Sequence, residues 1–436
     1  MKIIIVIFWF IIFTKLLFFW LWLWQLKEYH FGRFKAHFEA QAAKKIISSF
    51  WRIKYPKFTF KMILVFLVCL AVEILLLLYF QIVFAILLSF FFIPLLILFF
   101  QIPSAIWRKI AIRRAKKKRA SFKNLLVIGI TGSYGKTSTK EFLAKLLSSR
   151  FRVLKTKEHQ NSEIGISRCV LNELQEEHEI FVVEMAAYNK GGIKLLCDIV
   201  KPKIGMVTGV NEQHLATFET MENLLSAEGG GELIESLPED GVAFFNAQNE
   251  HCRNLYQKTG IKKFLYGENA SFRGGENILG AVAVARELGM REEEILRACE
   301  KIENKFPGIE IKKGVNGLNI IDATYSANPD GVLAHLEYLK TLPGKKAVVM
   351  PCLIELGKAS AEVHRKIGKK IGEACDLAII ITKDRFKEVR EGAGEKALFL
   401  EDVKDIFEKI MNFCSPGDVV LLESRMPGRL IELLIP

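Results

Sequence analysis

Residues 125–138 read LLVIGITGSYGKTS, and this stretch decides the fold of the chain. Its first six residues are a short, continuous apolar run, which predicts a buried strand. The segment TGSYGKTS (131–138) follows as a glycine-containing loop, and residues 139–149 then have the apolar period of a helix. A strand, a glycine loop with a Lys-Thr pair and a helix are the context that a phosphate-binding loop requires. The stretch therefore predicts an α/β domain with a nucleotide site.

The loop supplies the groups that bind phosphate. Glycines let backbone N–H groups approach the phosphates, and the helix N-terminus adds a positive dipole. Lys136 is expected to neutralise phosphate charge, and the Thr137 hydroxyl is expected to bind Mg²⁺. The pattern departs from the general form, because Ile130 stands where its first glycine belongs. The predicted nucleotide-binding residues of the loop are Gly132, Ser133, Gly135, Lys136, Thr137 and Ser138.

Polar side chains follow two further apolar strands. Residues 179–185 (EIFVVEM) contain Glu184, which an apolar run does not need for packing, and His214 follows the strand at 204–208. Strands that alternate with helices predict a mostly parallel sheet, and ligands gather at the carboxyl ends of its strands. Taken alone, Glu184 and His214 could equally be ordinary surface residues. Their shared placement predicts that they converge with Thr137 on one metal and phosphate site.

The charge of the chain is unevenly distributed. The 436 residues have a net charge of +13, but residues 1–124 hold 20 Lys and Arg and three acids. Beyond residue 124 the balance is 41 basic and 45 acidic residues, so a nucleic-acid partner is not expected. The eight cysteines are scattered without a CxxC pair, which argues against a zinc site or a disulfide framework.

The first 124 residues resemble a membrane region. Residues 3–24 are almost unbroken hydrophobe, and residues 62–102 form a run about twice the ~20 residues that one membrane helix needs. The second run predicts a hairpin that turns near residues 79–81. The first run lacks a small-residue cleavage site and is rich in Trp near its end, which favours a retained anchor over a signal peptide.

Basic residues set the expected orientation of these helices. The segments 25–61 and 103–124 each carry nine Lys or Arg, and such segments remain in the cytoplasm. The sequence thus predicts three transmembrane helices with an outside N-terminus. We therefore expect a multi-pass protein of the cytoplasmic membrane, with its catalytic domains in the cytoplasm.

Several segments beyond residue 124 carry a family resemblance. They are TGSYGKTS (131–138), NSEIG (161–165), VVEM (182–185), the NEQH stretch that ends at His214, LPEDGVAFFNAQN (237–249), Asn277 in ENILGAVAVA, IIDATYSANPDG (320–331), IELG (354–357) and His364. In these segments and in their order, residues 125–436 resemble the Mur ligase family, most closely its MurF branch, which adds a D-Ala-D-Ala dipeptide.

The resemblance implies an ATP-dependent amide ligase of peptidoglycan precursor synthesis. ATP would convert a precursor carboxylate into an acyl phosphate, which the amine of an amino acid or dipeptide would then attack. The implied architecture is a central ATP-binding domain at 125–307 and a Rossmann-like C-terminal domain at 308–436, after the membrane region. The implied catalytic residues are Lys136, Asn161 and His214, and the implied metal ligands are Thr137, Glu184 and His214. Asn277 would contact adenine, and the residues facing the nucleotide cleft from the last domain would be Asp322, Tyr325 and Asn328.

The sequence also departs from the family pattern. The family has a lysine, often carbamylated, where this chain reads AEGGGE (227–232), and Gly230 is expected at its place. The family has an arginine around Gly308, an Asp at the position of Ala323 and an Asn at the position of Ser326. It also has a lysine about the position of Glu423. Family members of the MurF type begin with a soluble domain for the UDP-sugar, and here the membrane region stands instead.

These departures leave alternatives open. The acceptor is UDP-linked or lipid-linked, with a polyprenyl diphosphate in place of UDP. A ligase for another acid, of the folate or amino-acid polymer type, is a second enzyme reading. The third alternative is not an enzyme: it is a nucleotide-binding membrane scaffold that has lost catalysis.

Overall fold

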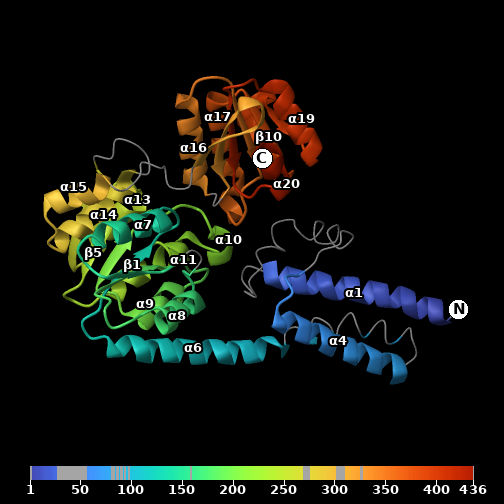
Figure 1. Cartoon of the computed structure of the whole chain (residues 1–436), viewed down its shortest axis with the longest axis horizontal. Coiled ribbons are helices and arrows are strands. Elements are labelled where there is room, and N and C mark those ends of the chain that lie inside the picture. Colours follow the sequence, from blue (N-terminus) through green and yellow to red (C-terminus); the bar gives the residue numbers. More distant parts are fainter. Residues whose placement is uncertain are drawn as a thin grey trace. The chain divides into compact units, whose positions relative to one another are not determined.

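The computed structural model describes residues 2–26, 56–79, 84, 88, 92, 95–96, 99–157, 160–268, 275–300, 310–324 and 328–435. The chain forms two compact units, Met1–Arg114 and Ala115–Pro436. Within the second unit, two six-stranded sheets are each covered by helices (Figure 1). The α/β class predicted from the sequence is confirmed.

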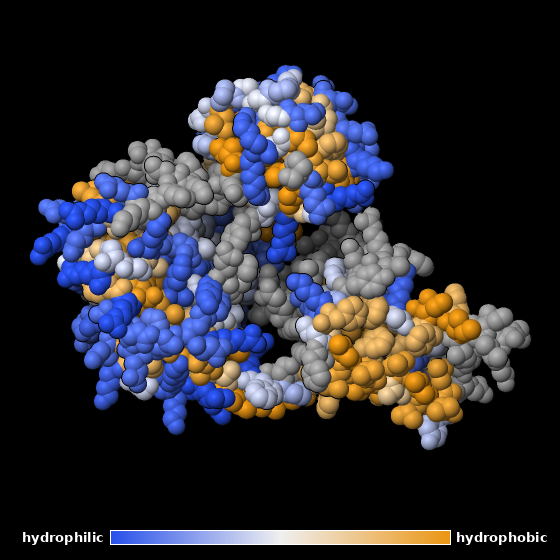
Figure 2. All heavy atoms as spheres, viewed as in Figure 1, coloured by the Kyte–Doolittle hydropathy of each residue, from blue (hydrophilic) through white to orange (hydrophobic). Residues whose placement is uncertain are grey.

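The first unit is built on two long apolar helices, α1 (Lys2–Leu26) and α4 (Phe60–Tyr79). Phe13 and Leu17 of α1 pack in one buried cluster with Met62 of α4. Trp9 Nε1 donates a 2.5 Å hydrogen bond to Glu73, which gives this acid the shelter that it requires within an apolar helix. The remaining surface of both helices is largely hydrophobic (Figure 2).

The described part of the chain contains one helix, Met62–Tyr79, that is long and apolar enough to cross a membrane. The apolar part of α1, Ile7–Leu23, is shorter. α4 ends at Tyr79, inside the predicted turn, and most of the predicted third span lies outside the described residues. Three transmembrane helices therefore stay a prediction.

The basic segment after the apolar run forms one continuous helix, α6 (Gln101–Ser121), which the sequence reading did not anticipate (Figure 1). Its last turns attach to the second unit. Lys118 Nζ donates to Leu171 O over 3.0 Å and Arg119 Nε donates to Val200 O over 2.8 Å. Both carbonyls lie at helix C-termini, where cations interact favourably with the helix dipole.

The first sheet of the second unit has the strand order β2-β3-β1-β4-β5-β6, and all its pairs are parallel. Ile130 of β1 pairs with Glu184 of β3 and with Met206 of β4, so these strands end at the same edge. The strands are β1 (Leu126–Thr131), β2 (Val153–Lys155), β3 (Ile180–Glu184), β4 (Ile204–Val207), β5 (Val242–Asn246) and β6 (Lys262–Tyr266).

Helices cover both faces of this sheet, as a parallel sheet with apolar strands requires. α7 and α14 pack their apolar side chains on one face in a cluster that includes Leu143, Phe244 and Val284. The helices are α7 (Lys136–Leu147), α8 (Glu163–Asn172), α9 (Gly192–Val200), α10 (Leu215–Phe218), α11 (Met221–Ser226), α12 (Gly231–Glu235), α13 (Glu250–Lys258), α14 (Gly275–Glu287) and α15 (Glu292–Glu300).

The second sheet has the order β11-β10-β9-β12-β8-β7, and only the edge pair β7–β8 is antiparallel. Its four central strands, β10, β9, β12 and β8, are apolar segments whose side chains are mostly buried. The predicted domain boundary at 307 and 308 lies outside the described residues. The strands are β7 (Glu310–Lys313), β8 (Asn319–Ala323), β9 (Lys346–Met350), β10 (Leu377–Ile380), β11 (Ala397–Phe399) and β12 (Val419–Glu423).

Two apolar clusters fill the two faces of this sheet. One joins the sheet to α16, α17 and α18, and the other joins it to α19 and α20. The helices and helical turns are η1 (Val315–Gly317), α16 (Pro329–Thr341), η2 (Gly357–Ala359), α17 (Ser360–Ala374), α18 (Phe386–Ala393), η3 (Gly394–Lys396), α19 (Val403–Phe413) and α20 (Gly428–Leu434).

Candidate nucleotide-binding and catalytic site

The predicted phosphate loop connects the end of β1 to the start of α7. Gly132 and Gly135 have positive φ angles of 139° and 78°. A Cβ on Gly132 would lie 2.3 Å from Thr208 Oγ1, and a Cβ on Gly135 would lie 2.7 Å from Asn277 Oδ1. Both positions therefore require glycine, for the backbone angle and for space. The loop is pressed closely against the end of β4 and against α14.

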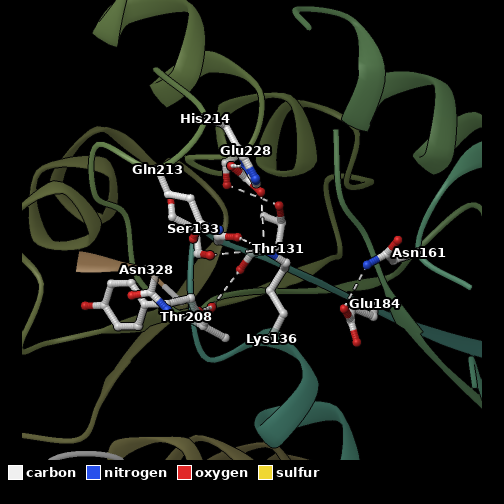
Figure 3. Close-up of polar contacts among 12 residues, drawn as sticks. Thr131, Ser133, Lys136, Asn161, Glu184, Thr208, Gln213, His214, Glu228 and Asn328 are labelled. Atoms are coloured by element: carbon white, nitrogen blue, oxygen red, sulfur yellow. Dashed lines mark hydrogen bonds and ion pairs between the residues drawn. The ribbon is translucent and has the colours of Figure 1, made fainter. Parts of the chain in front are cut away.

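The ammonium of Lys136 lies beside a buried carboxylate that comes from far along the chain. Lys136 Nζ is 3.2 Å from Glu228 Oε1, and Glu228 Oε2 is 3.0 Å from His214 Nδ1 (Figure 3). Lys136 Nζ also donates to the carbonyl oxygens of Gly132 and Ser133. The three side chains form a continuous polar chain from the phosphate loop to the segment after β4.

Glu228 is fully buried, yet the site keeps it charged. Burial opposes ionisation, but the neighbouring Lys136 and His214 outweigh burial and hold the pKa of Glu228 below its ordinary value. A buried carboxylate beside a cation of the phosphate loop is a typical feature of a functional site. Glu228 is therefore a candidate site residue, and it lies in the segment AEGGGE (227–232), where the family lysine is missing.

Gly230 itself does not contribute a side chain to the site. Its φ angle is 100°, and a Cβ there would lie 2.5 Å from Val207 Cγ2. A lysine side chain at this position would clash with Val207 of β4, which is already packed. That Gly230 occupies the sequence position of the family lysine stays a prediction, and the glycine brings no side chain there. Glu228, two residues earlier, is the side chain from this segment that enters the site (Figure 3).

The C-terminal domain contributes residues to the same region. His214 Nε2 lies 3.7 Å from Glu355 Oε2, and Ala216 N donates to Glu355 O over 3.1 Å. Asn211 Nδ2 donates to Asn328 Oδ1 over 3.3 Å and to Asp330 Oδ2 over 2.8 Å. Asn328, which was predicted to face the cleft, therefore contacts the segment that leads to His214.

Glu184 belongs to a second polar group, separate from His214 (Figure 3). Asn161 Nδ2 donates to Glu184 Oε1 over 3.0 Å, and the fully buried ammonium of Lys140 lies 3.3 Å from Glu184 Oε2. Glu141 Oε1 lies 3.3 Å from the same ammonium. The sequence reading missed Lys140, although its spacing of four from Lys136 places both lysines on one side of α7.

The three predicted metal ligands, Thr137, Glu184 and His214, contact different partners in the structure. Thr137 starts α7, while His214 contacts Glu228 and Glu355, and Glu184 contacts Lys140 and Asn161. In the ranges that the structure describes, no group of three His, Cys, Asp or Glu side chains could hold a metal ion. The metal-ligand assignments stay predictions.

Three further predicted residues lie as follows. Asn277 is buried on α14, and its Oδ1 accepts a 3.1 Å hydrogen bond from Thr139 Oγ1, which places it behind the phosphate loop. Asp322 accepts from Lys312 Nζ over 2.9 Å and from Thr324 Oγ1 over 2.7 Å, within its own domain. Tyr325 lies outside the described residues.

Comparison with known proteins gives the same assignment along most of the chain. Residues 130–290 match the Mur ligase middle domain, and residues 309–425 match the Mur ligase, glutamate ligase domain. The UDP-N-acetylmuramoyl-tripeptide–D-alanyl-D-alanine ligase of Synechocystis is 29% identical over 68% of this chain and 71% of its own length. The Bacillus subtilis enzyme of the same name is 28% identical over 71% and 75%.

A solved structure agrees with these relatives. The MurF ligase of Thermotoga maritima in complex with ADP superposes with a TM-score of 0.64 at 25% identity, covering 75% of this chain and 83% of that one. The two matched domains, the order of their motifs and the fold of both sheets lead to one conclusion. The chain belongs to the Mur ligase family of ATP-dependent amide ligases.

Proposed function

We propose that this protein is a MurF-type ligase of peptidoglycan precursor synthesis. It converts a precursor carboxylate into an acyl phosphate with release of ADP, and joins the acyl group to an amine with release of phosphate. The observation that carries this proposal is the polar chain Lys136–Glu228–His214, which ends 3.7 Å from Glu355 of the C-terminal domain. It links the phosphate loop to the domain that would position the second substrate.

The residues of the loop fit ATP. The glycines at 132 and 135 have no space for a side chain, so only backbone lines this part of the loop. Lys136 would hold the β- and γ-phosphates, and the N-terminus of α7 would add its dipole. ATP supplies the phosphoryl group that turns the carboxylate into a good acyl donor. The chain supplies position and charge stabilisation, which dominate phosphoryl transfer.

The donors at this site also suit Mg²⁺. The ion is usually held by one or two carboxylates together with substrate phosphates, rather than by a complete protein cage. Glu228 supplies a buried, charged carboxylate, and His214 and Thr137 supply two further candidate donors. Glu184 is already neutralised by Lys140, so we assign it to the support of Asn161 near the reacting centre. Bound Mg²⁺ would reduce the charge repulsion between phosphate and the incoming carboxylate.

The acceptor that we propose is a UDP-linked muramoyl peptide, because the relatives are named for this substrate and for D-alanyl-D-alanine. A lipid-linked form of the same peptide is the second candidate. The helix Met62–Tyr79, with the length and composition of a membrane span, favours it. We also propose that the protein sits in the cytoplasmic membrane with both ligase domains in the cytoplasm, on the basis of its flanking basic residues.

One product assay tests the activity. Full-length protein in liposomes receives ATP, Mg²⁺, D-alanyl-D-alanine and either a UDP-linked or a lipid-linked muramoyl tripeptide, and mass spectrometry detects the pentapeptide. ATP-dependent product with the UDP-linked form supports the main proposal, and preference for the lipid-linked form supports the second candidate. ATP hydrolysis that no amine stimulates, without any product, would instead indicate a scaffold that lacks ligase activity.

A further inference from the structure

Helix α6 carries isoleucines and cations along one side. With about 100° between successive residues, Ile102, Ile106 and Ile110 share one side of the helix, and Arg113 and Lys117 continue the same stripe. Ala115, on the opposite side, is fully buried. The stripe is thus apolar over its first half and cationic over its second half. We call these five residues the α6 stripe.

The α6 stripe is exposed. Ile102, Ile106 and Ile110 are 55%, 54% and 42% exposed, and Trp107 beside them is 71% exposed. Arg113 and Lys117 are exposed as well. Three isoleucines and a tryptophan on one short stretch are an unusual surface for a protein in water. The helix also carries eight Lys and Arg and no acid, which makes it strongly cationic.

The last turns of α6 are fixed to the ATP-binding domain. Lys116 lies 3.6 Å from Asp198, and Lys118 and Arg119 donate to the carbonyl oxygens that end α8 and α9. Arg119 Nη2 also donates to Leu125 O over 3.1 Å, directly before the strand that leads to the phosphate loop. These contacts leave Arg113 and Lys117 exposed.

We propose that the α6 stripe is a membrane-surface contact, which lies in the headgroup region of a bilayer and binds anionic phospholipids. The inference rests on the proposed membrane position of the chain. Isoleucine and tryptophan enter the boundary between headgroups and acyl chains, and Arg113 and Lys117 bind the lipid phosphates. Charge complementarity favours an anionic membrane as the partner, because the helix carries eight Lys and Arg and no acid. The contact also continues from the membrane-length helix Met62–Tyr79 along the same chain.

The helix consequently ties the ligase domain to the membrane surface. The apolar part of the stripe enters the interface, and the cationic part follows at the level of the phosphates. Lys118 and Arg119, at the end of the same helix, donate hydrogen bonds to the domain that carries Lys136.

The test uses the full chain in lipid nanodiscs with a fluorophore on one introduced cysteine. Seven of the eight native cysteines are buried, and the remaining one, Cys299, is replaced by Ser in every sample. The label sits at Ile106→Cys, at Leu75→Cys on α4 as a membrane reference, or at Lys369→Cys on α17 as an aqueous reference. Lipids with a nitroxide near the top of the acyl chain quench labels that enter the interface.

We expect strong quenching at Ile106→Cys in discs with 30% anionic lipid and almost none at Lys369→Cys. The double change Arg113→Glu and Lys117→Glu should remove at least half of the quenching at Ile106→Cys, as should zwitterionic discs. The matched change Lys404→Glu and Lys409→Glu on the exposed face of α19 should leave quenching at Ile106→Cys intact. It alters net charge equally but lies far along the chain from α6.

Other outcomes overturn the proposal in distinguishable ways. Quenching at Leu75→Cys without quenching at Ile106→Cys would leave the anchor in place and reject the α6 stripe. Absence of quenching at both positions would reject the membrane position itself. Quenching at Ile106→Cys that ignores lipid charge and the Glu variants would reject headgroup binding. A label that is shielded from water without lipid quenching would assign the stripe to a protein partner.

Discussion

The carboxylate of Glu228 lies 3.2 Å from the ammonium of Lys136, across 92 positions of sequence. Neither residue can change without leaving the other in a different charge environment, because Glu228 is fully buried. Lys136→Ala should therefore reduce ligation below a tenth of the wild-type rate, through loss of the charge that holds phosphate. Product formation by mass spectrometry checks this, and circular dichroism verifies that the variant is folded. Retention of a larger share of turnover would refute the loop assignment.

Glu228→Gln separates the charge of this side chain from its shape. We expect a higher Mg²⁺ requirement and a ligation rate lower by about 10- to 100-fold, which is typical when a metal ligand or its support is altered. The measurement is the rate as a function of Mg²⁺ concentration.

Glu232→Gln is the matched control for Glu228→Gln. Glu232 is also buried in the same segment, but it accepts hydrogen bonds from the backbone of Gly191 and Lys194 at the start of α9. Its substitution should lower thermal stability and leave the Mg²⁺ requirement almost unchanged. An equal shift in Mg²⁺ requirement for both variants would contradict the special role of Glu228.

Glu184 and Lys140 should behave as one buried pair. Glu184→Gln leaves the fully buried ammonium of Lys140 with Glu141 as its remaining carboxylate neighbour, so it should destabilise the protein by about 3 kcal/mol. The double variant Glu184→Gln and Lys140→Met should recover much of this loss, because no buried charge remains. Thermal unfolding of the single and double variants checks the coupling. Additive losses would show that the two side chains act independently.

Substitutions at Gly230 and Gly191 separate the cost of steric crowding from the cost of a positive φ angle. Gly230→Ala has to overcome a positive φ angle and a contact of 2.5 Å with Val207, whereas Gly191→Ala has a similar φ angle of 86° and open space. We expect Gly230→Ala to be the more destabilising, by about 1–3 kcal/mol, which is the cost of overpacking. Gly230→Lys should be at least as damaging and should add no metal ligand. Increased ligation by Gly230→Lys would contradict this packing.

His364 gives the C-terminal domain a pH dependence. Its Nε2 accepts a 2.9 Å hydrogen bond from Leu353 N, and burial holds the pKa of His364 below its ordinary value of 6.5. The folded state binds the proton less readily than the unfolded state, so this contribution is complete above pH 6.5. It is lost as the pH falls from there through the lowered pKa of the folded state.

His364→Gln tests this dependence, because its amide oxygen can still accept from Leu353 N but does not titrate. The loss of thermal stability between pH 7.5 and pH 5.5 should be smaller in His364→Gln than in the wild type. Identical pH profiles would show that other groups determine the acid sensitivity.

The sequence predicted the parts of the fold that depend on local patterns. Apolar runs located β1, β3 and β4, and the register of Ile130 with Glu184 follows from their parallel pairing. The contacts between Lys140 and Glu184, and between Lys136 and Glu228, were not predictable in this way. They join residues that are distant in sequence, and only the folded arrangement brings them together. The sequence did not predict the α6 stripe. Its basic residues were interpreted only as a signal for membrane orientation, and their positions around a helix were not considered.

The arrangement around Glu228 makes nucleotide binding an exchange of anions. Lys136 already has a carboxylate partner supplied by the protein, so an arriving phosphate competes with Glu228 for the same ammonium. If phosphate bound Lys136, the carboxylate would lose its ammonium neighbour and would be available to attract a Mg²⁺ ion that accompanied the nucleotide. In that case the buried acid would occupy the position of the phosphate until the nucleotide binds, and the affinity for the nucleotide would depend on its metal.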